Sequence, residues 1–385
     1  MMNRKQVVML QWIALILLVV CLAGFIVYGL VSRFTGGKSE KKAMEAGNTT
    51  TEAQSGNDTE GEEAQAVLPT PTPDPVRTYT LSFAGDCTIG SLIEWQGTQP
   101  GDFQSVVGTD YSYPLSGVKS IFAADDLTVV NLEGTFTTAV DAVVKPYRFR
   151  ADPAYAQVLT EGSVEAVSTS NNHSGDFLEQ GLSDTHAALD VKGIEYTHAG
   201  APLIKELDGG LKLGIVTYNT VENWDGLNAW YASVKTDIEA CKAADCDLII
   251  GFMHWGTVEY LVEPEDWEVV FAHTMADWGC DLIVGGHAHI LQRMEYYNDV
   301  PIFYSMGNFC YGGHLNPNDK DSVIVQAEFT RNAETGEVTR SGLRVIPCLV
   351  SSQTLSNDYC PTPCAEGSED YKRIVERLQW SSSDT

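Results

Sequence analysis

Side chains able to bind a metal ion stand at or just past the ends of five apolar stretches of this 385-residue sequence. Apolar stretches of this length, bounded by polar and glycine residues, are typical of buried strands. In an open α/β fold, ligands bind outside the carboxyl ends of the strands. We therefore expect these side chains to meet at one site. They are Asp86, Glu133, Asn172, His173, His254, His287 and His289.

The types of these residues favour a divalent transition metal. The GGHAH stretch places His287 and His289 two residues apart, so both rings can reach one ion or two neighbouring ions, and its glycines allow close backbone approach. A mixed set of nitrogen and oxygen ligands suits Mn, Fe, Zn or Co. Two such ions about 3.5–4 Å apart would clamp a phosphoryl group and generate hydroxide at neutral pH. The simpler alternative is that these side chains only form loop hydrogen bonds.

The elements that must position these residues alternate between strands and helices, which predicts an α/β fold. Helices are expected near 178–191, 234–244 and 265–278. Two alternating strands, 322–330 and 338–347, are joined by the turn AETGE. The remaining strands are expected at 78–85, 127–133, 164–173, 211–219, 247–256, 281–289 and 301–309.

The N-terminal part predicts a membrane anchor. Residues Trp12 to Val31 form an uncharged run of 20 residues, long enough to span about 30 Å of hydrocarbon as a helix. Residues 35–76 are rich in Gly, Ser, Thr and Glu and end in LPTPTPDP, which is typical of a disordered stalk. More basic residues follow the span than precede it, so the charge rule favours a cytoplasmic domain. The stalk favours the opposite side, and we expect the domain outside the cytoplasm.

Composition excludes some partners. The formal net charge is −28, which argues against nucleic acid and against docking on anionic lipid. The nine cysteines contain no zinc-type CxxC pairs. A disulfide between Cys360 and Cys364 is an option only in an oxidising compartment.

Several motifs occur together in the order and spacing of a known family. They are GDCTIG, NLEGTFTT, KPYRFRADP, SNNHSGDFLEQGLSDT, HWGTVEY, GGHAHILQ and YSMGNF. Over about 78–350 the chain resembles the CapA family, which is associated with poly-γ-glutamate capsule synthesis and has the calcineurin-like metallophosphoesterase fold. The resemblance implies an αββα sandwich at 77–350, after an anchor at 1–34 and a linker at 35–76, and before a C-terminal extension at 351–385. It also implies that the anchored domain lies on the outer side of the cell membrane, away from the cytoplasm.

The resemblance also implies roles for single residues. Asp86 and Glu133 would be carboxylate ligands, Glu133 in a bridging position. Asn172 would be an amide ligand, and the three histidine ligands would be His254, His287 and His289.

His173 would face the leaving group as an acid or oxyanion partner. Asp176 would orient His173, unless it caps the following helix. Arg148 or Arg150 would bind a substrate carboxylate or phosphate, unless both pair with surface acids. One departure concerns the metal number: where the wider phosphoesterases have Asp-x-His, this chain has Asp86-Cys87-Thr88, so one metal position lacks a histidine.

These features leave two classes of function open. In the first, the protein is a hydrolase or transferase acting on an anionic polymer or a phosphoester of the cell envelope, with one or two metal ions. In the second, it is a subunit of a polymer synthesis and export complex that uses the same site to bind polymer or partner subunits.

Overall fold

The computed structural model describes residues 75–221 and 226–381. The predicted anchor and nearly all of the predicted linker lie outside the described residues. Within these two ranges, no helix is both long and apolar enough to cross a membrane.

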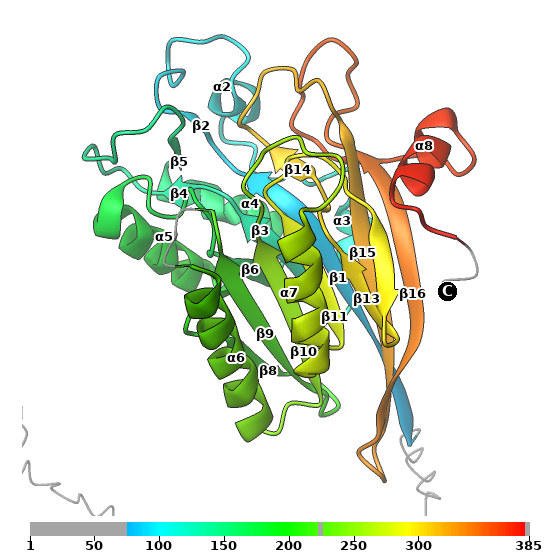
Figure 1. Ribbon diagram of the computed structural model, residues 1–385. Coiled ribbons are helices and arrows are strands. Elements are labelled where there is room, and N and C mark those ends of the chain that lie inside the picture. The colour runs from blue at the N-terminus through cyan, green and yellow to red at the C-terminus, as the bar shows by residue number, and fades with distance from the viewer. Residues whose placement is uncertain (1–74, 222–225, 382–385) are drawn as a thin grey trace, which may run out of the picture. The chain divides into compact units, whose positions relative to one another are not determined.

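Two mixed β-sheets form the centre of the domain (Figure 1). The first has the order β17-β16-β15-β1-β3-β6-β7, with β14 also paired to β1. Its strands β1, β3, β6 and β7 run parallel. β15 lies antiparallel beside β1, and β16 lies antiparallel beside β15. The bounds are β1 Val76–Thr88, β3 Leu127–Leu132, β6 Ala166–Ser168, β7 Glu195–Thr197, β14 Asn308–Tyr311, β15 Asp321–Asn332, β16 Val338–Leu349 and β17 Thr362–Pro363.

The second sheet has the order β12-β13-β11-β10-β9-β8, with the four middle strands parallel. Its bounds are β8 Leu203–Glu206, β9 Lys212–Asn219, β10 Leu248–His254, β11 Leu282–Gly286, β12 Met294–Tyr297 and β13 Val300–Phe303. A small third sheet joins β2 Ser91–Leu92, β4 Thr135–Phe136 and β5 Phe149–Ala151.

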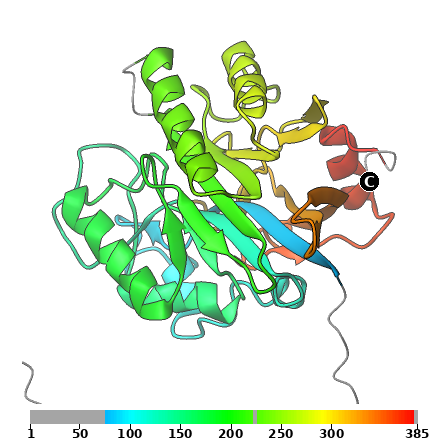
Figure 2. The same ribbon diagram turned by 90° about the horizontal axis from the view of Figure 1, so that it is seen from below.

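Helices lie on the outer faces of both sheets. Figure 2 shows α6 and α7 on one side of the strands and α5 on the other. The longer helices are α5 Leu178–Lys192, α6 Leu227–Ala243 and α7 Asp266–Asp277. The shorter ones are α2 Phe103–Val107, α3 Lys119–Phe122, η1 Pro153–Ala156, α4 Gln157–Glu161 and α8 Glu369–Arg377.

The alternation of side chains along the strands explains this layering, because successive residues of a strand point to opposite faces. Leu81 and Phe83 of β1 share one buried cluster with Ile250 and Val284 of the second sheet, which places that cluster between the sheets. Val130 of β3 belongs instead to a second cluster with residues of α3, α4 and α5. A third cluster joins β10 and β11 to α6 and α7. The predicted α/β sandwich with helices outside two facing sheets is confirmed.

The prediction of one strand over 301–309 is wrong. β13 ends at Phe303 in the second sheet, and β14 begins at Asn308 in the first, so the chain crosses between the sheets. The crossing uses Gly307 at φ 68°, a conformation that favours glycine. Its carbonyl accepts a hydrogen bond from the Asp86 amide, and a Cβ on Gly85 would lie 2.0 Å from that oxygen. The two glycines therefore allow the crossing chain to touch β1 directly.

The segment after residue 350 packs against the same domain. β17 pairs with β16, and Ile374 and Leu378 belong to the cluster between the sheets. The predicted extension is therefore built into the fold along most of its described length. Cys360 and Cys364 are free thiols in this structure.

Candidate metal centre

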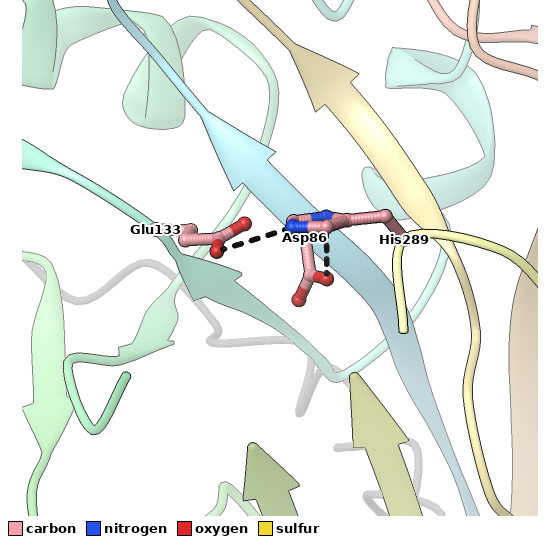
Figure 3. Close-up of side chains that lie close together, drawn as sticks. All are labelled: Asp86, Glu133 and His289. Atoms are coloured by element: carbon pink, nitrogen blue, oxygen red, sulfur yellow. Dashed lines mark ion pairs between the residues drawn. The ribbon is translucent and has the colours of Figure 1, made fainter. Parts of the chain in front are cut away.

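The centre is assembled from both sheets at the carboxyl ends of their strands. Asp86 lies near the end of β1 and Glu133 directly after β3, whereas His254 ends β10 and His289 follows β11. All four side chains are buried. Figure 3 shows Asp86, Glu133 and His289 converging from three different segments.

Glu133 is the group of the centre whose burial is least offset by hydrogen bonds. Its side chain is fully buried, and neither carboxylate oxygen has a hydrogen-bond partner among the described residues. Three imidazole nitrogens face its Oε1 atom: Nε2 of His254 at 3.7 Å, of His289 at 3.9 Å and of His173 at 4.0 Å. These distances are too long for hydrogen bonds. Burial, and then the charge of Asp86, raise the pKa of Glu133 well above its ordinary value.

Asp86 lies between the two histidines contributed by the second sheet. Its Oδ1 is 3.7 Å from Nδ1 of His254, and its Oδ2 is 3.7 Å from Nδ1 of His289. The Asn131 amide donates to Oδ1 at 2.7 Å, and the backbone amide of His287 donates to Oδ2 at 3.0 Å. A Cβ on Gly286 would lie 2.4 Å from Oδ1, so glycine at this position makes room for the carboxylate.

This arrangement fits a divalent metal ion. Bonds of about 2.0–2.2 Å from nitrogen and oxygen ligands place neighbouring ligand atoms about 3 to 4 Å apart. One ligand atom each from Asp86, Glu133 and His289 lies within 4.8 Å of the others. A fully buried carboxylate is stable only when it is protonated, paired or bound to a metal. The donor set of carboxylates and imidazoles is the mixed set that transition metals prefer.

Two of the histidines, His254 and His287, are held in the neutral form that binds metals. Burial and the neighbouring His287 place the pKa of His254 well below its ordinary value, and burial lowers the pKa of His287 to about 3. The two rings lie 5.1 Å apart, and Nδ1 of His287 is buried without a hydrogen-bond partner in the described structure. Asn172 joins the group because its Oδ1 is 2.8 Å from Nε2 of His254.

His173 stands beside the carboxylates with a fixed ring orientation. Its Nδ1 lies 2.9 Å from Oδ2 of Asp176, which leaves Nε2 facing Glu133. Asp176 also accepts a hydrogen bond from the Phe149 amide and forms an ion pair with Lys145 at 2.7 Å. The alternative in which Asp176 caps α5 is not seen: the helix begins at Leu178 without a side-chain cap.

The two arginines predicted to bind substrate contact other groups. Arg148 forms an ion pair with the exposed Glu94. Arg150 donates to the Ala139 carbonyl and to Gln96, and its guanidinium lies 5.1 Å from the centre of the Phe177 ring. Their substrate-binding role stays a prediction, and these contacts favour the alternative of surface pairing for Arg148.

Sequence reasoning missed two asparagines that hold the ligands in place. Asn131 bonds Asp86 and also lies 3.0 Å from Nδ1 of His254. Asn308 faces Nδ1 of His289 with its Oδ1 at 2.9 Å and donates to the His289 carbonyl. Asn131 lies in the NLE part and Asn308 in the GNF part of the family motifs. An asparagine next to a buried strand boundary in such a motif could have pointed to them.

The domain is thus an α/β sandwich whose two sheets share a buried histidine and carboxylate centre. The family model described as "Bacterial capsule synthesis protein PGA_cap" matches residues 80–312. The chain belongs to this family, which confirms the resemblance found from the motifs.

Relatives named for capsule synthesis are consistent with this assignment. The PGA biosynthesis protein CapA of Bacillus subtilis (strain 168) is 28% identical over 332 residues, covering 80% of this chain and 81% of that protein. The capsule biosynthesis protein CapA of Bacillus anthracis is 29% identical over 207 residues, covering 46% of this chain and 47% of that protein. Among solved structures, the calcineurin-like phosphoesterase YfkN of Bacillus subtilis matches with a TM-score of 0.44 at 14% identity, over 79% of this chain and 97% of that chain. A phosphatase from Mycoplasma pneumoniae matches with a TM-score of 0.43 at 17% identity, over 74% of this chain and 95% of that chain.

Proposed function

We propose that this protein is a metal-dependent hydrolase of capsule polymer synthesis, acting on a phosphoester or on the γ-amide of a glutamate polymer. The observation that carries the proposal is Glu133, a fully buried carboxylate without hydrogen bonds that faces three imidazole nitrogens. Membership of the capsule synthesis family supports the biological setting.

In this proposal, six residues hold one or two divalent ions: Asp86, Glu133, Asn172, His254, His287 and His289. A bound ion would activate water and polarise the scissile group. His173 has the geometry of a proton carrier, because Asp176 fixes Nδ1 and leaves Nε2 directed at the centre. Nε2 can take a proton from the attacking water and return it to the leaving oxygen or nitrogen.

The test uses the full chain purified in detergent. We expect bound Mn or Zn in the wild type and its loss in the double variant His287→Ala/His289→Ala. The matched control is His186→Ala/His198→Ala, because those two rings stack 5.6 Å apart away from the carboxylates, and it should keep the metal. Bis(4-nitrophenyl) phosphate and γ-glutamyl 4-nitroanilide then distinguish the two bond types. Equal metal content in the wild type and the His287/His289 variant would refute the proposal.

The second candidate is a subunit that binds polymer or partner subunits of the synthesis complex without catalysis. It is favoured by Thr88, which stands where the wider phosphoesterases have a histidine. Substitution of His173 separates the two candidates, because a binding site does not need a proton carrier.

We also propose that the domain is anchored by residues 12–31 and faces away from the cytoplasm. The uncharged run and the Pro- and Thr-rich segment before residue 76 support this location. Protease added to intact cells should release the domain. If the domain is protected from protease until the membrane is permeabilised, it lies in the cytoplasm, as the distribution of basic residues around the apolar run predicts.

A further inference from the structure

A cavity of about 180 Å³ adjoins the metal centre at His289. It is lined by His289 and Asn308, by Tyr260, Tyr311 and His314, and by the segment 317–319. The rings of Tyr260 and Tyr311 lie 6.1 and 5.7 Å from that of His289. With about 30 Å³ for each water molecule in the liquid, the volume corresponds to roughly six waters.

The cavity lining combines apolar surface with a few polar groups and contains no lysine or arginine. Phenol, imidazole and amide groups offer hydrogen bonds, and the tyrosines add aromatic surface. Transferring phosphates are usually held by arginine, lysine or metal ions. The cavity therefore suits an uncharged arm of a substrate, next to the bond that the metal centre would attack.

One wall of the cavity lies between two hollows. Residues 317–319 also line a second cavity of about 550 Å³. Pro317 is buried and the Asp321 amide donates to Asp319, but among the described residues the segment makes no backbone-to-backbone hydrogen bonds. None of these contacts joins the segment to the loop that carries His289.

Arg377 of α8 supplies the missing restraint. Its Nη1 atom lies 2.6 Å from Oδ2 of Asp319 in the wall, and its Nε donates to the Leu291 carbonyl at 3.1 Å. Leu291 is two residues past His289. One guanidinium group therefore joins the cavity wall to the loop that carries a candidate metal ligand.

Arg373, one turn earlier on α8, provides an internal comparison. It binds Asp321 through Nε and Nη2 and pairs with Asp370, but within the described part of the chain it contacts neither Asp319 nor Leu291. Both arginines therefore hold α8 to β15, whereas only Arg377 reaches both sides of the cavity. The helix itself is fixed independently, because Ile374 and Leu378 are fully buried.

We propose that the 180 Å³ cavity is the subsite for an uncharged arm of the substrate, and that Arg377 is the positioning residue that sets its shape. The subsite rests on the hydrolase function proposed above. The positioning of the wall does not, because it follows from the contacts of Arg377 alone. The helix α8 lies outside residues 80–312, which the family model matches, so this role is a property of the chain's own C-terminal part.

The first measurement is hydrogen exchange on the full chain with Mn²⁺ in detergent. In Arg377→Ala, the amides of Asn316 and Asp321, which are bonded to His314 and to Asp319, should exchange about tenfold faster or more, since the charge-assisted hydrogen bond to Asp319 is lost. Arg373→Ala should leave this segment close to the wild type, and Arg377→Lys should restore part of the protection. Unchanged exchange in Arg377→Ala, or an equal rise in Arg373→Ala, would overturn the positioning role.

The second measurement is the hydrolysis of bis(4-nitrophenyl) phosphate, which carries an uncharged aromatic arm. Arg377→Ala should raise KM several-fold while kcat, metal content and the thermal midpoint stay close to those of Arg373→Ala. An equal KM in both variants would refute the subsite. If no variant and no wild-type protein hydrolyses the diester while metal is bound, the phosphoester form of the proposed function and its subsite both fail. The γ-amide form is then tested with γ-glutamyl 4-nitroanilide, and hydrogen exchange alone decides the role of Arg377.

Discussion

Glu133 makes opposite contributions to stability with and without a metal ion. In the metal-free protein its buried carboxyl group has no hydrogen-bond partner in the described structure, and its pKa is raised by burial. We predict that Glu133→Gln raises the metal-free stability at pH 8, because the folded protein must bury a charge or bind a proton at Glu133, whereas glutamine requires neither. The same change should abolish the stabilisation by Mn²⁺. Thermal unfolding in EDTA and in Mn²⁺ measures both effects, and a variant that is less stable in EDTA yet still responds to Mn²⁺ would contradict the prediction.

His173 allows catalysis to be separated from metal binding. We predict that His173→Ala lowers hydrolysis by about 10²–10⁴-fold, the usual contribution of a proton-transferring residue, while metal content is unchanged. His254→Ala should lose both, because its ring lies against both carboxylates. The comparison is made at matched protein abundance by metal analysis and by rate. Near-normal hydrolysis by metal-loaded His173→Ala would show that His173 is not the proton carrier, whereas near-normal surface polymer in cells with this variant and no measurable hydrolysis would favour the binding role.

Among single residues, those of metal-binding type that follow an apolar stretch were the easiest to single out from the sequence. Asp86, Glu133, His254 and His289 follow apolar stretches, and strand geometry alone brings such residues to one edge. Their partners carry no comparable signal. Asn131 acts through hydrogen bonds across the sheet, and such pairings become visible only when the strand register is known.

Helix α7 begins with a pair of glutamates that makes its stability depend on pH. The backbone amide of Glu265 donates to the Glu268 side chain, which forms a capping box with Glu265. Burial raises the pKa of Glu268 to about 7, above the ordinary value of 4.5. Because the folded protein then holds this proton more tightly than the unfolded chain, the free energy of unfolding falls as pH rises from about 4.5 to 7.

We predict that Glu268→Gln flattens this decline. Glutamine keeps an oxygen for the Glu265 amide and carries no charge, so the variant should match the wild type near pH 5 and exceed its stability above pH 7. The difference between the two pKa values corresponds to at most about 3 kcal/mol. Denaturant unfolding at pH 5 and pH 8 measures the effect. A Glu268→Gln protein that loses stability with pH as steeply as the wild type would contradict the assignment to this carboxyl group.

Among the elements, length and context decided what could be predicted. The strands that became β1, β3, β9, β10 and β11, and the helix α7, have clear apolar patterns and are found close to their expected bounds. The run at 301–309 reads as one strand because its apolar pattern continues through the crossing between sheets. Only the contact of Gly307 with Gly85 and Asp86, more than 200 residues earlier, shows why it divides.

For the whole molecule, the centre joins two sheets that also meet through apolar side chains and through hydrogen bonds such as the one between Ser168 and Thr217. A ligand that binds only the folded state stabilises it by RT ln(1 + [L]/Kd), about 2.7 kcal/mol at one hundred times Kd. We predict that the thermal midpoint of the full chain rises steadily with Mn²⁺ concentration above Kd, and that Mg²⁺ at the same concentration has a smaller effect because imidazole ligands disfavour it. Equal midpoints at all Mn²⁺ concentrations would mean that the centre binds no Mn²⁺ in the folded protein.

The position of β1 between β3 and β15 has a consequence for the order of events during synthesis. β1 is the first strand of the domain, and its antiparallel partner β15 spans Asp321–Asn332, near the end of the chain. Until β15 has emerged, the edge of β1 that it covers is unpaired. The first sheet, which carries Asp86 and Glu133, is therefore complete only when translation is nearly finished. The ion proposed above would then be acquired in the compartment where the finished polypeptide folds.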